Sequence, residues 1–142
     1  MALDVAPTKT RRPRPLIGAA AGSALALVAN TVIYFVANAI RGESVQASMD
    51  GATASDVPYV AVLAASIAPL LVGAAVLWVL SKLSRSSLRI WTIVALVLTV
   101  VSLAAPLTLP VDGGSKVALA LMHIAAGTSA IVGQRWAASR GA

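Results

Sequence analysis

Four polar side chains lie near the middles of long apolar stretches, and they are the residues there best able to do chemistry. These residues are Asn30, Ser66, Ser102 and His123. A neutral histidine can donate and accept a proton, and it can activate a nearby serine hydroxyl as a nucleophile. At the rise of an α-helix, all four fall at a similar depth, within roughly 5 Å of the middle of their stretches. The sequence therefore predicts a candidate polar cluster, with His123 as its most versatile member.

A purely structural role is the alternative for these side chains, and we favour it. Polar residues at contacts between membrane helices hold the helices together, at about 0.6 kcal/mol for each hydrogen bond. Small and polar residues also recur at helical spacing in three stretches, which predicts closely packed faces. These faces are Gly18, Gly22, Ala26 and Asn30; Thr92, Ala95, Thr99, Ser102 and Pro106; and Lys116, Ala120, His123, Gly127, Ala130 and Gln134.

Catalytic and metal chemistry have little support in the sequence. One histidine and no cysteine do not supply the ligands of a typical zinc site. A Ser–His pair would have no evident third group to orient the histidine, and no nucleophile motif surrounds Ser66 or Ser102. We therefore predict no enzyme activity, no catalytic residue, no metal and no cofactor. An intramembrane enzyme that uses His123 stays a third alternative.

Four apolar segments position these side chains, and each approaches or exceeds the length of a membrane helix. They cover about 16–40, 58–80, 90–111 and 117–136, and about 18 or more apolar residues are typical of a span. Apolar residues make up 58% of the chain and charged residues 11%, which is too little charge to cover a water-exposed surface. The predicted fold is all-α, a four-helix transmembrane bundle in up-down-up-down order. A basic arm, residues 1–15, precedes the bundle, and a tail, residues 137–142, follows it.

The connections and the prolines predict local features of this bundle. Residues 41–57 are polar, which favours a flexible loop with little apolar anchor. Residues 112–115, Asp-Gly-Gly-Ser, predict a tight turn in which the glycines allow positive φ and Ser115 caps the fourth helix. Pro69 and Pro106 each remove a backbone hydrogen bond, so both are candidate helix kinks.

The basic residues predict that both chain ends are cytoplasmic. Nine of the 11 Lys and Arg residues fall on the arm, on the loop between the second and third spans, and at the chain end as Arg135 and Arg140, whereas Arg41 and Lys116 fall on the other side. Positive charge gathers on the cytoplasmic side of membrane proteins. Trp78, Trp91 and Trp136 then fall at the inner boundary, where tryptophan is enriched. We predict a multi-pass protein of the plasma membrane.

The net charge of +6 predicts a lipid partner and not a nucleic acid. The cations flank apolar spans, where anionic headgroups are the nearest partners. The residues expected to bind these headgroups are Arg11, Arg12, Arg14, Lys82, Arg85 and Arg89.

A cleaved signal peptide is an alternative reading of the first segment. The basic arm precedes an apolar run, and Ala37-Asn38-Ala39 is similar to a small-residue cleavage site. The run of about 25 residues is longer than the roughly 7–15 of a signal-peptide core, so we favour a membrane span.

The last segment carries a resemblance to a family. Residues 118–124, Ala-Leu-Ala-Leu-Met-His-Ile, followed by Gly127, resemble the last span of a family of small four-span bacterial membrane proteins of unknown function. The family pattern is Ala-Leu-Met-His-Leu, from which this chain differs at Ile124. Its third span also follows a basic loop with an aromatic residue, here at 89–91, and ends in a proline-containing stretch, here at 105–107. The resemblance implies a four-helix fold in the plasma membrane and brings no known activity.

Two functions are predicted from these observations. The first is a non-enzymatic membrane protein that acts by association with itself or with an envelope complex, because small-residue faces favour helix contacts. The alternative is a small-ligand or lipid-binding or transport module with its polar cluster around His123.

Overall fold

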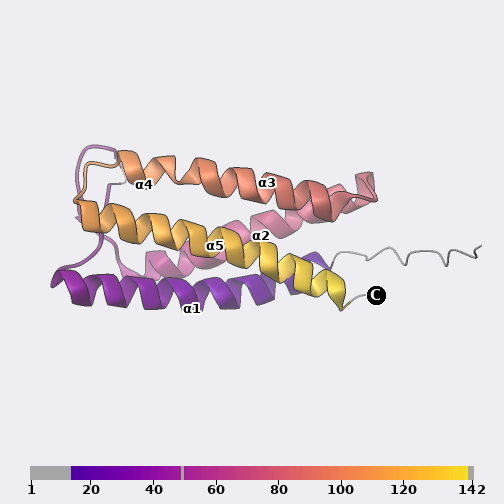
Figure 1. Ribbon diagram of the computed structural model, residues 1–142, viewed down its shortest axis with the longest axis horizontal. Helices are drawn as coiled ribbons and strands as arrows, with labels where there is room; N and C mark the ends of the chain where they lie inside the picture. Colours follow the sequence, from indigo (N-terminus) through magenta and orange to yellow (C-terminus); the bar gives the residue numbers. More distant parts are fainter. Residues whose placement is uncertain (1–13, 49, 141–142) are drawn as a thin grey trace, which may run out of the picture.

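A computed structural model describes residues 14–48 and 50–140. Its helices are α1 (Pro15–Arg41), α2 (Tyr59–Leu83), α3 (Ser87–Ser102), the short α4 (Ala104–Thr108) and α5 (Gly113–Ser139). Two strands of two residues each, β1 (Gln46–Ala47) and β2 (Ser55–Asp56), pair antiparallel between α1 and α2. Helix α4 continues in the direction of α3, so these two helices together form one rod (Figure 1). With α1, α2 and α5, the described residues form four rods. The predicted all-α, four-helix fold is confirmed.

The four rods have the length and composition of membrane spans. They are Pro15–Arg41, Tyr59–Leu83, Ser87–Thr108 and Gly113–Ser139, and large apolar side chains cover their outer surfaces. Exposed aliphatic residues on every helix are costly in water and favourable in hydrocarbon. The chain is therefore a multi-pass membrane protein. Most of the predicted arm lies outside the described residues, and so do Arg11, Arg12 and the last two residues of the predicted tail.

Helix ends follow the chemistry of the chain, with one correction. Gly42 ends α1 in the left-handed region, at φ 69°, and its N–H donates to the Asn38 carbonyl at 2.9 Å. We expected Ser115 to cap the last helix after a glycine turn, and this expectation was wrong. Asp112 is the N-cap, because its carboxylate accepts the Ser115 N–H at 2.9 Å, and the helix begins at Gly113. The glycines at 113 and 114 therefore belong to the first helical turn and have negative φ.

The helices α1 and α5 form the closest contact of the bundle, and they run side by side (Figure 1). A Cβ built on Gly133 would lie 2.6 Å from the Gly22 amide nitrogen, and one on Gly22 would lie 2.8 Å from the Ser129 carbonyl oxygen. The predicted face of α1 is buried at Gly18, Gly22, Ala26 and Asn30. Glycine at these positions lets the two backbones touch.

The prediction of which residues form the packed face of the last span was only partly right. Gly127 packs against α3, where a Cβ would lie 2.8 Å from the Thr99 Cβ, and Gln134 is buried. The more deeply buried row of α5 is set one or two residues away from the predicted one, at Ser115, Ala118, Met122, Ser129, Gly133 and Ala137. The helix therefore uses two neighbouring faces, one toward α1 and one toward α3.

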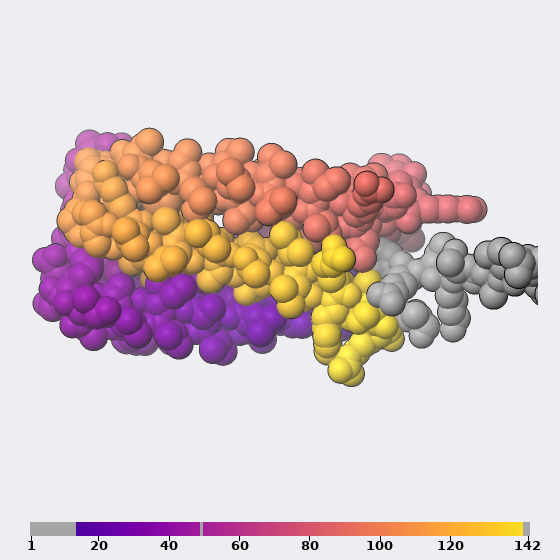
Figure 2. Space-filling model, viewed as in Figure 1, coloured from indigo at the N-terminus to yellow at the C-terminus, as the bar shows by residue number. Residues whose placement is uncertain are grey.

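The helix α3 lies at the edge of the bundle. Only Ser87 and Trp91 of its residues are buried, and Figure 2 shows a narrow gap between α3 and α5. Trp91, near the start of α3, is 4% exposed. Its indole N–H donates to the Gly73 carbonyl at 2.8 Å, and its ring covers Gly73 of α2. This bond and the ring contact attach α3 to α2.

Candidate functional site

The loop between α1 and α2, described at residues 42–48 and 50–58, has an apolar anchor, so our expectation of little apolar anchor was wrong. Val45 is fully buried among Tyr34, Val62 and Met122. Its N–H donates to Asn38 Oδ1 at 2.8 Å, and its carbonyl accepts the Val57 N–H at 2.9 Å. One valine in a polar segment gives no periodic signal, so the sequence alone did not reveal this anchor.

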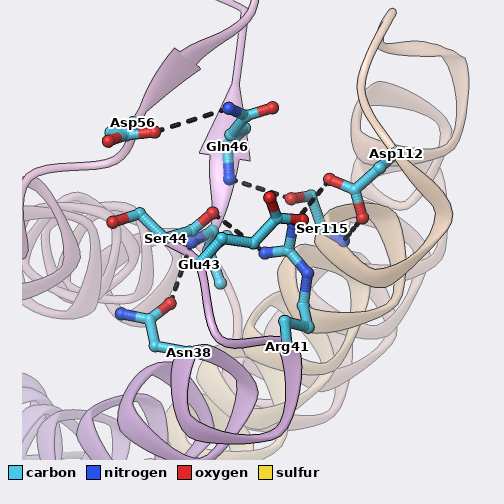
Figure 3. Close-up of polar contacts among 9 residues, drawn as sticks. Asn38, Arg41, Glu43, Ser44, Gln46, Asp56, Asp112 and Ser115 are labelled. Carbon is cyan, nitrogen blue, oxygen red and sulfur yellow. Dashed lines mark hydrogen bonds and ion pairs between the residues drawn. The ribbon is translucent and has the colours of Figure 1, made fainter.

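Arg41 joins this loop to the start of α5. Its guanidinium pairs with Asp112 at 2.8 Å and with Glu43 at 2.9 Å, and it also donates to the Ser44 carbonyl at 3.0 Å (Figure 3). Only 12% of the Arg41 side chain is exposed. Bidentate or multiple contacts to a guanidinium fix geometry better than a single surface ion pair does. Arg41 therefore fixes the end of α1 and the start of α5 against the loop.

A second tie connects the hairpin to α5. The Gln46 N–H of β1 donates to the Ser115 hydroxyl at 2.9 Å, and Ser115 is fully buried. Hydrogen bonds from the side chain and then the backbone of Ser115, with the charge of Arg41 as a smaller cause, lower the pKa of Asp112. The carboxylate thus stays ionised while it caps the helix and pairs with Arg41.

Asp50 organises the tip of the loop. Its carboxylate accepts the N–H groups of Thr53 and Ala52 at 2.7 and 2.9 Å and the Ser48 hydroxyl at 2.9 Å. These bonds, the Thr53 amide first, hold the pKa of Asp50 well below its usual range. Carboxylate acceptors of this kind are typical of stable polar turns. We call the assembly of residues 42–48 and 50–58 with Arg41, Asp112 and Ser115 the outer cap, after the membrane side that the positive-inside rule predicts for it.

The structure joins two of the four residues of the predicted polar cluster. Asn30 of α1 donates from Nδ2 to the Ser66 hydroxyl of α2 at 2.9 Å, and Ser66 donates to the Val62 carbonyl at 2.8 Å. Asn30 is 3% exposed and Ser66 is fully buried. The hydroxyl of Ser66 is thus used both as donor and as acceptor in holding α1 to α2.

Ser102 and His123 instead bond to carbonyls of their own helices. Ser102 donates to the Thr99 carbonyl at 2.8 Å, and His123 Nδ1 lies 2.7 Å from the Leu119 carbonyl oxygen. A carbonyl oxygen only accepts, so this bond places the proton on Nδ1 and leaves the Nε2 lone pair of neutral His123 unused by it. Each residue lies about one turn from the Thr99–Gly127 contact, which brings both to a similar level of the α3–α5 contact.

The two prolines have different effects. Pro69 lies inside α2, which continues from Tyr59 to Leu83. Pro106 is buried, and the helix is interrupted at Leu103 between α3 and α4. Proline lacks an N–H and clashes with the carbonyl four residues earlier, here that of Ser102, which accounts for the interruption at this point.

One family model covers almost the entire chain: it is described as a family of unknown function, DUF6069, and it matches residues 10–140. The chain belongs to this family. The DUF6069 match agrees with the resemblance drawn from the last span, while the Met122-His123 motif and a bacterial source stay predictions. No curated protein and no solved structure shows significant similarity to the chain.

Proposed function

We propose that this DUF6069 protein is a non-enzymatic, multi-pass protein of the plasma membrane that binds a partner protein through its outer cap. One observation carries this proposal: the described part of the loop, residues 42–48 and 50–58, is tied to the helices by Val45, Arg41 and Ser115. A loop that only joins two antiparallel helices needs few residues, and ordered loops longer than roughly 12–15 residues usually bind or catalyse.

The orientation proposed from the basic residues puts the outer cap outside the cytoplasm. Arg85 and Arg89 lie at the end of the bundle opposite the outer cap, whereas the cap carries exposed Glu43, Asp50 and Asp56. The positive-inside rule then favours cytoplasmic chain ends. The cap would offer a partner a carboxylate-rich surface, so a partner with a basic patch is expected.

Packing within the chain supports a partner at the cap over self-association through small residues. Two glycines of the predicted small-residue faces already contact other helices of the same chain: Gly22 meets Gly133, and Gly127 meets Thr99. Close helix packing at those faces is therefore unavailable to a second copy. The hydroxyl of Ser66 is committed to structural bonds, which supports a non-enzymatic role.

Photocrosslinking in native membranes tests this proposal. A photoreactive amino acid at Thr53, an exposed residue of the loop, is expected to capture a protein, and one at lipid-facing Val97 is the control. Replacing Val45 with Asn should abolish the Thr53 adduct, because a polar group in the buried anchor position releases the loop. If Thr53 gives no protein adduct, or if only an adduct of twice the chain mass forms, partner binding by the cap is wrong.

A second proposal rests on the free lone pair of His123. A small polar ligand at the α3–α5 contact would donate a hydrogen bond to Nε2, in keeping with the predicted ligand-binding alternative. An experimental structure in lipid is expected to show non-protein density next to Nε2. A ring that contacts only helix side chains there would exclude this second role.

A further inference from the structure

A second surface, at the inner end of the bundle, has the features of a lipid site. A groove of about 520 Å³ runs between the start of α1 and the last turns of α2. Its lining is Arg14, Pro15, Leu16, Ile17, Leu71, Ala74, Ala75 and Trp78. This volume lies within the roughly 300–1,000 Å³ of small-ligand sites. The two alanines leave the space, and the larger side chains form the walls.

The walls of the groove are apolar and face outward. Leu16 is 76% exposed, Leu71 is 50% and Trp78 is 57% exposed. Trp78 and Leu71 lie seven residues apart on one helix, which places Leu71 about 10 Å deeper than the indole. Tryptophan is enriched at the headgroup level. The groove therefore runs from the headgroup level toward the hydrocarbon, as an acyl chain does.

Positive charge gathers at the mouth of the groove. Arg14 lines it directly, and the Lys82 ammonium lies 5.5 Å from the centre of the Trp78 ring. Within residues 14–48 and 50–140, the ion pairs are those of Arg41, so neither cation has a carboxylate partner there. Both cations are exposed, so an anion from outside the described residues can pair with them.

The start of α1 adds a second source of positive potential. Arg14 occupies the N-cap position, but its side chain makes no hydrogen bond to the N–H groups of the first turn, and that turn has no acidic residue. The N–H groups of the first turn, those of Leu16 and Ile17, have no partner within the helix. Such N–H groups and the helix dipole favour a phosphate, and both residues line the same groove.

We propose that this groove is a specific site for an anionic phospholipid. One acyl chain lies along Leu71, Ala75 and Trp78, and the phosphate lies at Arg14, Lys82 and the start of α1. An anionic lipid fits because a lipid without net charge would leave two cations uncompensated. The site is at the opposite end of the bundle from the outer cap, so this inference does not depend on the proposed partner.

Native mass spectrometry of the full chain in mild detergent tests the site. Phosphatidylglycerol is expected to stay bound at one molecule per chain and to exceed phosphatidylcholine at equal concentration. The double substitution Arg14→Gln with Lys82→Gln is expected to weaken phosphatidylglycerol binding roughly 30-fold, because each cation near an anionic headgroup contributes about 1 kcal/mol. Equal binding of the two lipids by the unsubstituted chain would overturn the proposal.

Two further variants separate this groove from general surface charge. Arg85→Gln with Arg89→Gln removes the same charge from the same end of the bundle, at residues expected to meet headgroups of the surrounding bilayer and outside the groove lining, and should weaken binding much less than the groove variant. Ala75→Leu fills the groove without changing charge and should weaken binding, and circular dichroism shows whether it stays folded. Equal losses in both charge variants, or no change in Ala75→Leu, would overturn the proposal.

A diazirine side chain at Ala75 identifies the occupant directly in native membranes. An adduct with the mass of one phospholipid supports the proposal. An internal cross-link to residues 1–13, or a cross-linked dimer, would show that the chain itself fills the groove and would overturn it. Because these outcomes are read at Ala75, they are independent of the cross-links from Thr53 that test the outer cap.

Discussion

The contact between α1 and α5 differs from the contacts of α3 in the interactions that hold the helices together. Gly22 and Gly133 bring the backbones of α1 and α5 together, and the contact is closed at one end by Arg41 with Asp112. At the other end, Gln134 donates from Nε2 to the Pro15 carbonyl at 2.9 Å. The first and last helices of the chain are thus its most firmly paired elements.

The contacts of α3 are fewer and depend on single side chains. Trp91 bonds to α2 and Thr99 meets Gly127 of α5, while the hydroxyls of Thr92, Thr99 and Ser102 return to carbonyls of α3 itself. A hydroxyl bonded to its own helix contributes no bond across the contact. The comparison teaches that the α1–α5 contact combines small residues with polar ties at both ends, whereas the hydroxyls of α3 bond within their own helix.

The largest effect is expected from a side chain at Gly133. Gly133→Val places new atoms against the backbone of Gly22, which cannot rotate away, so we expect a loss of about 3 kcal/mol or more in the free energy of unfolding. Unfolding in mixed detergent micelles measures it. Gly113→Ala is the control, since a Cβ there meets nothing within 4 Å, and its effect should stay within about 0.5 kcal/mol. Equal effects of the two would break the comparison.

Removing the buried hydroxyl at the outer cap is expected to have the next largest effect. Ser115→Ala leaves the Gln46 N–H without its acceptor, which costs about 1–3 kcal/mol for a buried donor. Amide hydrogen exchange should show faster exchange at Gln46, with the Trp91 indole unchanged. Unchanged protection of Gln46 would mean that the outer cap does not depend on this bond.

The attachment of α3 is tested with two tryptophans. Trp91→Phe removes the hydrogen bond to Gly73 and is expected to cost about 1 kcal/mol. Trp78→Phe changes a side chain that is 57% exposed and should cost no more than about 0.5 kcal/mol. The same unfolding assay compares them. A larger loss for Trp78 than for Trp91 would contradict the position assigned to α3.

The divided polar cluster predicts unequal effects of two serine substitutions. Ser66→Ala removes the bond from Asn30 across the α1–α2 contact and is expected to cost about 0.6 kcal/mol, and at most about 1.7 kcal/mol. Ser102→Ala removes a bond to its own helix, with an expected change within about 0.3 kcal/mol. Equal losses would point to a hydrogen bond across helices at Ser102 as well.

The smallest effect is expected from acid at the outer cap. The pKa values of Asp50 and Asp112 are lowered in the folded chain, so their stabilising contribution is complete above the unfolded value of about 3.9. It is lost as pH falls through the lower folded values. Amide chemical shifts of Thr53 and Ser115 should therefore titrate with midpoints below about 3.9. Asp50→Asn should remove the midpoint at Thr53 only, and midpoints above that value would contradict the assignment.

Composition and the helical spacing of small residues allowed the four rods and one packed face to be predicted. Unbroken apolar runs determine the four rods, because lipid accepts only internally hydrogen-bonded backbone. The face of α1 with Gly22 and Asn30 was also predictable, since four-residue spacing repeats there. Its partners were not, because spacing along one helix does not say which neighbour covers it. Gly133 went unnoticed because it lies off the row assigned to α5.

The sites were less predictable than the fold, and for a physical reason. Depth along a helix placed Asn30, Ser66, Ser102 and His123 at one level, but rotation about the helix axis decides which of them meet. The outer cap depends on Val45, on Arg41 and on partners distant in sequence. Such long-range ties leave no local pattern, whereas the basic inner end did predict charge where the lipid groove is found.

The pairing of α1 with α5 has a consequence for how the protein is made. The ribosome must add the roughly 100 residues from Arg41 to Ser139 after α1 has emerged, which takes roughly 5–20 s. During this interval the face of Gly18 and Gly22 has no counterpart from the nascent chain. The bond from Asn30 to Ser66 is available once α2 has inserted, so an early helical hairpin can keep α1 in place until translation delivers its final partner.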